Sequence, residues 1–96
     1  MESNALRVSP QDNVAVATRA IPKGEAVVIA GKSACNTVED IRAAHKVALA
    51  AVAAGGKVIR YGEVIIEAAV PIASGAWVHV HNTRPVTAEG LQKAEV

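Results

Sequence analysis

The sequence predicts a mostly β fold: a compact domain of short strands and tight turns with one short helix. Two observations lead to this prediction, a repeated unit centred on glycine and a spacing of 31 residues that relates its copies in pairs. A third is the composition, since the 96 residues are 51% hydrophobic, mainly Ala and Val, with no Phe. Such small side chains fill a thin, closely packed core, and the length fits one domain.

The repeated unit places an apolar β-branched residue three positions before a glycine and a valine three positions after it. Its copies are ATRAIPKGEAVV (17–28), ALAAVAAGGKVI (48–59) and AAVPIASGAWVH (68–79), with IRAAHKV (41–47) as a weaker fourth. Gly24 and Gly55 are 31 residues apart, as are Ala44 and Gly75, which predicts two interlocking halves with a pseudo-twofold relation. Glycine supplies the positive φ of a tight turn, and the flanking Val and Ile suit strands. Each unit is therefore predicted to be strand, turn, strand.

Residues 37–56 taken alone resemble a helix, with a capping-box-like start at Thr37, many alanines and a glycine pair at the end. The repeat argues against this interpretation, because the sister copy carries Ile21-Pro22 and proline excludes a helix interior. We therefore predict strands for most of the segment. The one short helix is confined to the stretch near Val38–Ala43.

Composition excludes several classes of function. The net charge is only +1 and the charges are scattered, so the basic stripe of a nucleic-acid-binding protein is missing. The single cysteine, Cys35, excludes an intrachain disulfide and fits a reducing compartment. No leader pattern is visible, and no apolar stretch reaches the roughly 18 residues that span a bilayer. We expect a cytoplasmic protein, with the β domain at 1–84 and a polar tail or linker at 85–96.

The stretch WVHVHN (77–82) is the clearest candidate for a functional site. In a strand, Trp77, His79 and His81 share one face, and residues two apart stand about 6.5–7 Å from each other. Both imidazoles could then converge on one ion or one substrate, since neutral imidazole binds divalent metals and titrates near neutral pH. The alternative is a buried strand whose histidines are satisfied by their neighbours.

Five blocks of the sequence, taken together, resemble one family. The blocks are DNVAVA (12–17), IPKGE (21–25), HKVAL (45–49), VIRYGEVI (58–65) and VHVHNTR (78–84). They resemble the SAF-type (β-clip) domain that forms the N-terminal domain or small subunit of the altronate/galactarate dehydratase family, which includes the sulfolactate sulfo-lyase small subunit. The chain departs from the family pattern at Ala44 and Ile66, where glycine is usual, and at Trp77, where histidine is frequent.

The resemblance implies a part of a carbon–oxygen lyase (hydro-lyase) that is inactive alone. The implied reaction eliminates water from an aldonic or aldaric acid such as altronate or galactarate and gives a 2-keto-3-deoxy acid. It also implies a divalent metal, iron(II) or manganese(II), completed by another domain, and a large catalytic dehydratase domain or subunit as partner. The alternatives are a sulfolactate sulfo-lyase small subunit and a non-catalytic SAF module for carbohydrate binding or assembly. Homo-oligomer formation is left open.

Within this resemblance, seven residues are candidates for the site. His79, His81 and His45 are the candidate acid–base residues, and His79 and His81 the candidate metal ligands. Two histidines are an incomplete set, so a further ligand would come from His45 or from a second domain. The candidate substrate-binding residues are Lys46, Arg60, Tyr61 and Asn82. For each of these four, a solvated charge, a packing ring or a turn-capping amide is the structural alternative.

Overall fold

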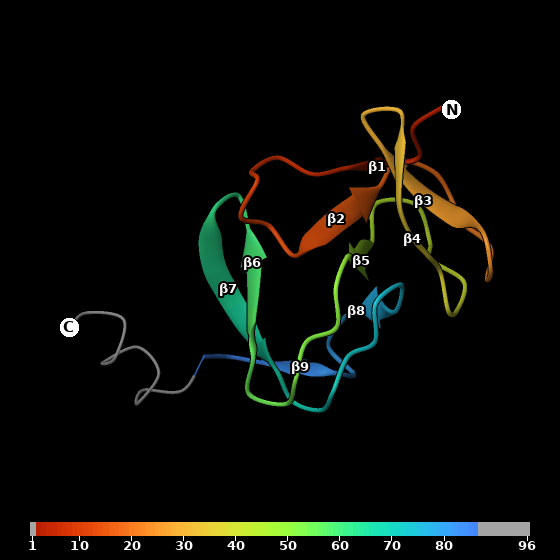
Figure 1. The fold of residues 1–96 in the computed structure, drawn as a ribbon. Helices are drawn as coiled ribbons and strands as arrows, with labels where there is room; N and C mark the ends of the chain where they lie inside the picture. The colour runs from red at the N-terminus through yellow and green to blue at the C-terminus, as the bar shows by residue number, and fades with distance from the viewer. Residues whose placement is uncertain (1, 87–96) are drawn as a thin grey trace.

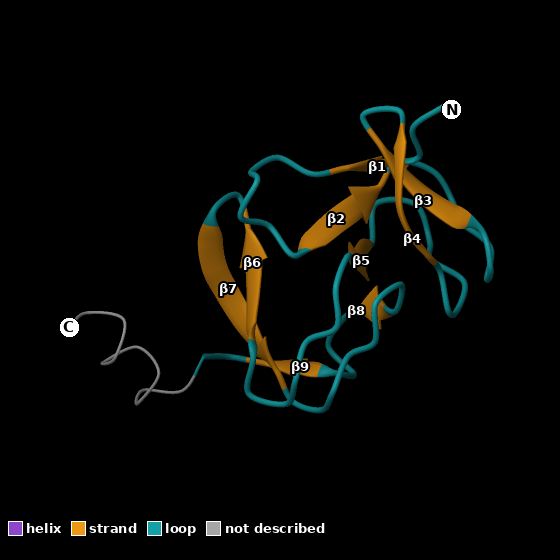
Figure 2. Ribbon diagram, viewed as in Figure 1, coloured by secondary structure: helices purple, strands orange, loops and turns teal. Residues whose placement is uncertain are grey.

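The computed structural model describes residues 2–86, and these residues form strands and turns with no helix (Figures 1 and 2). The strands are β1 (Ala5–Leu6), β2 (Val14–Ala17), β3 (Ala26–Ile29), β4 (Lys32–Asn36), β5 (Lys46–Ala48), β6 (Lys57–Arg60), β7 (Glu63–Ala68), β8 (Trp77–Val78) and β9 (Thr83–Arg84). The prediction of a compact, mostly β domain is confirmed. Nothing in this part of the chain is a helix that could cross a membrane. The predicted tail at 85–96 falls almost wholly outside the described residues.

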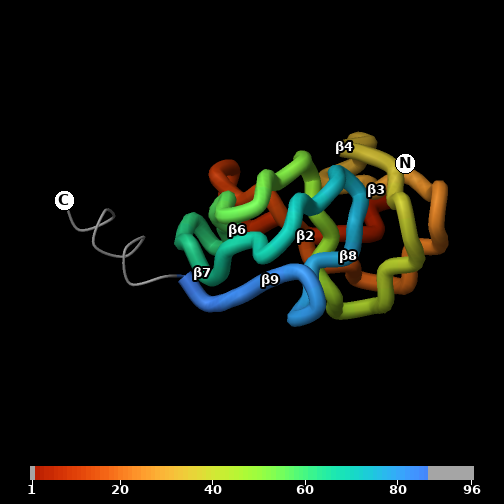
Figure 3. Tube along the Cα trace, turned by 90° about the horizontal axis from the view of Figure 1, so that it is seen from below, coloured from red at the N-terminus to blue at the C-terminus, as the bar shows by residue number. Residues whose placement is uncertain are grey.

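A four-stranded antiparallel sheet in the order β1-β2-β5-β8 forms the centre of the molecule. The β3–β4 hairpin lies on one side of it, and the β6–β7 hairpin, extended by β9, lies on the other (Figures 1 and 3). The central sheet therefore brings together segments that are far apart in the sequence. β5 pairs with β8, so Lys46 lies opposite Val78 and Val47 lies opposite Trp77.

The two hairpins are equivalent in the way the repeat predicts. The isolated bridge Ile21↔Ile41 has its counterpart in Val52↔Ile72, each partner shifted by 31 positions. The register shift after Val27 in β3 has its counterpart after Val58 in β6. The turn positions Gly24, Gly55 and Gly75 have φ of +86°, +81° and +84°, and Ala44 has φ of +69°. The sequence repeat thus corresponds to a repeat of pairing and of turn geometry.

The predicted helix near Val38–Ala43 is wrong, because long-range β contacts use the groups that would have started it. The Thr37 hydroxyl donates to the Pro22 carbonyl at 2.7 Å, and Asp40 accepts the Lys23 N–H at 2.9 Å. Ile41 exchanges backbone hydrogen bonds with Ile21 at 2.8 and 2.9 Å. Thr37 and Asp40 therefore hold two distant segments together and do not cap a helix.

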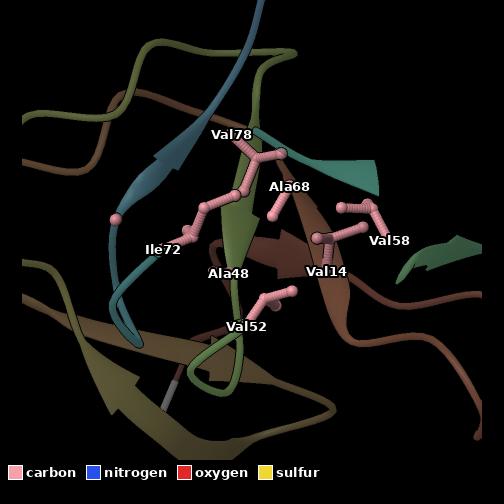
Figure 4. Close-up of a cluster of buried hydrophobic side chains, with 8 residues drawn as sticks. Val14, Ala48, Val52, Val58, Ala68, Ile72 and Val78 are labelled. Carbon is pink, nitrogen blue, oxygen red and sulfur yellow. The ribbon is translucent and has the colours of Figure 1, made fainter. Parts of the chain in front are cut away.

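The central sheet separates two small hydrophobic cores. The first core is Ala5, Ala15, Ala17, Ile21, Val27, Ile41 and Val47. The second core, whose side chains converge in Figure 4, is Val14, Ala48, Val52, Val58, Ala68, Ile72, Ala76 and Val78. Side chains alternate along β2 and β5, so the same two strands supply both cores. Trp77, the first residue of β8, packs against the first core.

Candidate functional site

Four rings gather where β5 meets β8. His45 directly precedes β5, and Trp77 begins β8. The ring centroids of Trp77 and His79 are 4.8 Å apart with an interplanar angle of 13°, so the two rings are stacked. His81 lies 4.8 Å from Trp77, and His45 lies 5.2 Å from His79. The three histidines named by the sequence analysis therefore surround one indole ring.

The histidines come together through a turn as well as a strand. β8 ends at Val78, and His79 to Asn82 form a turn in which the Asn82 N–H donates to the His79 carbonyl at 3.2 Å. The Thr83 hydroxyl donates to the same carbonyl at 2.7 Å. The centroids of His79 and His81 are 6.5 Å apart. The predicted shared side of Trp77, His79 and His81 is found, although the strand itself is shorter than expected.

Asn82 holds this turn through its side-chain amide. Its oxygen accepts the His79 N–H at 3.0 Å, and its nitrogen donates to the Trp77 carbonyl at 2.7 Å. Asn4 and Asn13 bridge an N–H and a carbonyl two residues apart in the same way, on β3 and β6 respectively. Asn82 is buried, so within this domain its amide positions the backbone that carries the histidines.

Two cations lie beside the rings. Lys46 in β5 is partly buried, and this burial, together with the nearby charge of Arg60, lowers the pKa of its ammonium group. Arg60 ends β6; its Nη2 donates to the Tyr61 hydroxyl at 2.5 Å, and its guanidinium lies 4.4 Å from the centroid of the Tyr61 ring. The Arg60 Nε is buried without a hydrogen-bond partner among the described residues. Lys46 and Arg60 therefore provide two positive charges, and the Arg60 Nε keeps an unused donor.

Tyr61 lies in a turn that is held by the distant Asp12, a contact that no sequence pattern indicated. Tyr61 and Gly62 have φ of +57° and +76°. The buried Asp12 carboxylate accepts the N–H groups of Ser9, Tyr61 and Gly62 at 2.8 to 3.1 Å. Burial alone would raise the pKa of this carboxyl, but the backbone donors outweigh it and the pKa is lowered. Asp12, Arg60 and Tyr61 also line a small surface pocket of about 110 Å³.

The cations affect the titration of the groups around them. The pKa of His79 is lowered, first by burial and then by the positive charge of His45, Lys46 and His81. Lys46 is in turn coupled to Arg60. Contacts join His45, His79 and His81 around Trp77, and separate contacts join Arg60 to Tyr61. Lys46 is within electrostatic range of both His79 and Arg60. The seventh predicted site residue, Asn82, holds the backbone that carries Trp77 and His79.

Carboxylates are scarce in this group. Glu39 accepts the Trp77 N–H at 3.1 Å, and Asp12 is committed to its turn. Within residues 2–86, no set of three or more His, Cys, Asp or Glu side chains is arranged to hold a metal ion. A catalytic metal usually takes three protein ligands, so the described residues do not build such a site by themselves. The arrangement instead suits the binding of an anion.

Fold and site together define a class: a small β domain of paired hairpins that presents imidazoles and cations on one surface. The sequence matches the profile of the altronate/galactarate dehydratase SAF domain over residues 3–85, and the chain belongs to that family. The family predicted from the sequence blocks is confirmed.

Two known relatives of the chain are both altronate dehydratases. The chain is 37% identical over 79 residues to the altronate dehydratase of Bacillus subtilis (strain 168). It is 38% identical over 79 residues to the altronate dehydratase of Escherichia coli (strain K12). Each match covers 82% of this chain but 16% of the relative, so the chain corresponds to a small part of these much larger proteins.

Proposed function

We propose that this chain is the small subunit or N-terminal domain of a sugar-acid dehydratase. The reaction eliminates water from an aldonic or aldaric acid such as altronate or galactarate and gives a 2-keto-3-deoxy acid. The observation that carries the proposal is the cluster of three histidine rings around Trp77, with the positive charges of Lys46 and Arg60 nearby. Membership of the altronate/galactarate dehydratase SAF family supports it.

The chemistry of the elimination matches the groups in the site. A base removes the proton next to the carboxylate, the hydroxyl leaves as water after accepting a proton, and the enol tautomerises to the keto acid. Lys46 and Arg60 would bind the carboxylate and stabilise the negative charge that develops on it. His79, whose pKa is lowered, is held toward its neutral form and suits the role of base.

The rest of the active site would come from a large dehydratase domain or subunit. The pocket beside Arg60 is only about 110 Å³, which is small for a six-carbon acid. The curated relatives are much longer than the matched region, which leaves ample chain for such a domain. An iron(II) or manganese(II) ion held jointly with that domain would take at most His79 and His81 from this chain. None of the roles assigned above depends on it.

The test uses this chain assembled with its large partner. His79→Ala is expected to lower kcat by roughly 10²- to 10⁴-fold, the usual contribution of a positioned acid or base. Size-exclusion chromatography should show the complex intact. Val80→Ala is the matched control, because Val80 is in the same turn and its side chain is 79% exposed. Unchanged turnover in His79→Ala would overturn the proposal and favour a non-catalytic SAF module.

Substrate identity is resolved in the same assay. Altronate, galactarate and sulfolactate are compared as substrates of the assembled enzyme. Water release from either sugar acid supports the proposal. Sulfite release from sulfolactate alone would replace it with the sulfo-lyase alternative.

A further inference from the structure

The indole of Trp77 makes a hydrogen bond that restricts the chemistry of His45. Trp77 Nε1 lies 3.0 Å from His45 Nδ1. The indole nitrogen is a donor only, so Nδ1 must accept and carries no hydrogen. A neutral imidazole with a bare Nδ1 has its hydrogen on Nε2. The contact therefore selects one of the two neutral tautomers of His45.

Both partners are held in place from several sides. The Trp77 N–H donates to Glu39 at 3.1 Å, and the Trp77 carbonyl accepts from Asn82 at 2.7 Å. The indole is stacked on His79 and packs against the first core. On the other side, the His45 N–H donates to the Arg42 carbonyl at 3.1 Å, and the His45 carbonyl accepts from Ala17 at 2.9 Å. The indole N–H is thus aimed at the imidazole by a rigid frame.

We propose that Trp77 is a positioning residue that fixes His45 as the Nε2–H tautomer, so that His45 serves the site as a hydrogen-bond donor. The donor would face a hydroxyl or carboxylate oxygen of the bound acid, and this part of the inference rests on the proposed function. The tautomer itself follows from the Trp77 contact alone.

The same contact excludes His45 as a ligand of a metal ion. A metal on Nε2 needs the lone pair there, which moves the hydrogen to Nδ1 and directs it at the indole N–H 3.0 Å away. A metal on Nδ1 would have to displace the indole. Either arrangement loses the hydrogen bond and sets two donors or a cation against the indole N–H. His45 is therefore separated in role from His79 and His81.

Nitrogen-15 NMR of the chain tests the tautomer directly. The spectra are recorded well above the ordinary histidine pKa of about 6.5, where imidazoles are neutral. His45 is expected to show a bare Nδ1 and a protonated Nε2, and Trp77→Phe, which keeps an aromatic ring but removes the donor, should give a mixture of tautomers. A wild-type spectrum with the hydrogen on Nδ1 would overturn the proposal. So would a folded Trp77→Phe variant with an unchanged tautomer.

Two substitutions of His45 test its role in the assembled enzyme. The amide of His45→Asn falls near the position of Nδ1 and can still accept from Trp77, whereas the amide of His45→Gln reaches the position of Nε2 and can still donate. If His45 acts as a donor, kcat/KM of His45→Gln should exceed that of His45→Asn by roughly tenfold, the value of one hydrogen bond. Equal kcat/KM in the two variants would overturn the donor role.

The two parts of the inference fail separately from the proposed function. If His79→Ala abolishes turnover while both His45 variants remain fully active, the dehydratase proposal stands and the donor role of His45 is wrong. If His79→Ala has no effect but the NMR spectra show the predicted tautomer, the proposed function is wrong and the Trp77 contact is still established.

Discussion

Asp12 illustrates how a single buried carboxylate can shape a site without facing a ligand. It accepts backbone N–H groups from two separate loops, from Ser9 between β1 and β2 and from Tyr61 and Gly62 between β6 and β7. Tyr61 adopts a positive φ of +57°, which is unfavourable for a residue with a side chain. The carboxylate stabilises this turn, and the turn places Tyr61 against Arg60.

Asp12→Asn is expected to destabilise the fold at neutral pH and to reduce its sensitivity to acid. The pKa of Asp12 in the folded chain is below its ordinary value of 3.8, so the ionised carboxylate favours the folded state. This contribution is fully present above the unfolded pKa and is lost as the pH falls through the folded pKa. The amide of Asn does not titrate there. The thermal unfolding midpoint of the variant should therefore be below that of the wild type at neutral pH. The two midpoints should converge as the pH is lowered below 3.8.

Glu63 is exposed and directly follows the Tyr61–Gly62 turn that Asp12 holds, so it provides the control. Glu63→Gln should change the unfolding free energy by no more than about 0.5 kcal/mol. An Asp12→Asn variant with the acid sensitivity of the wild type would show that other carboxyls cause the effect.

Ala44 occupies a backbone conformation that favours glycine, with φ of +69°. We expect Ala44→Gly to stabilise the fold by about 0.5–1 kcal/mol. Removing the side chain from a left-handed backbone conformation stabilises the folded state by about 1–2 kcal/mol. The greater conformational entropy of glycine in the unfolded chain offsets about 0.4–1 kcal/mol of this gain. The matched control is Ala43→Gly in the same turn, where φ is not positive and only the loss remains. Urea unfolding measures both, and a destabilised Ala44→Gly would contradict the argument.

At the scale of the elements, the four tight turns have different tolerance for a side chain. A Cβ added at Gly24 would meet nothing within 4 Å, whereas one at Gly75 would lie 2.0 Å from the carbonyl oxygen of Asn36. Both positions have a positive φ. At Gly75 the second half of the chain packs directly against the end of β4 and the segment that follows it, since the Val38 N–H also donates to the Gly75 carbonyl at 3.0 Å.

Gly75→Ala should therefore destabilise the fold much more than Gly24→Ala. The conformational term of about 1–2 kcal/mol applies to both variants. Only Gly75→Ala adds a clash with the main chain, which brings the expected loss above about 3 kcal/mol. Urea unfolding of the two variants gives the comparison, and equal losses would mean that the close approach of Asn36 relaxes at little cost.

Sequence reasoning found these turns because a glycine repeat expresses a local need for positive φ. It failed at Val38–Ala43 because local capping preferences were the only available signal there. In the structure, Thr37 and Asp40 bond to Pro22 and Lys23, 15 and 17 residues away. Helix propensity describes a segment in isolation, and β pairing outweighs it where distant partners are present.

At the scale of the molecule, the residues of the candidate site could be predicted from the sequence, but their arrangement in space could not. The types and positions of His45, Lys46, Arg60, Tyr61 and His79 could be named from the sequence blocks. Their convergence depends on the β5–β8 pairing and on contacts such as Trp77 to His45, 32 residues apart, or Gly62 to Asp12, 50 residues apart. No spacing rule indicates such pairs, so the roles of Trp77 and Asp12 emerged only from the fold.

The two cores share β2 and β5, and this connection predicts that the molecule unfolds as one unit. Ile41 and Ile72 are equivalent residues of the first and second core, exposed by 1% and 2%. Ile41→Ala and Ile72→Ala should each lower the unfolding free energy by about 2–5 kcal/mol. Trp77 packs against the first core and reports on it by fluorescence, while circular dichroism reports on all strands.

In a single cooperative transition, Ile72→Ala must shift the Trp77 fluorescence midpoint and the circular dichroism midpoint together, although Ile72 belongs to the other core. The exposed Val80 gives the control. Val80→Ala should change the unfolding free energy by no more than about 0.5 kcal/mol and leave both midpoints close to those of the wild type. Two halves that unfold independently would separate the probes, with the fluorescence midpoint of Ile72→Ala unchanged. Because side chains from β2 and β5 fill both cores, losing one core exposes the back of the sheet on which the other is built, and we expect the two midpoints to coincide.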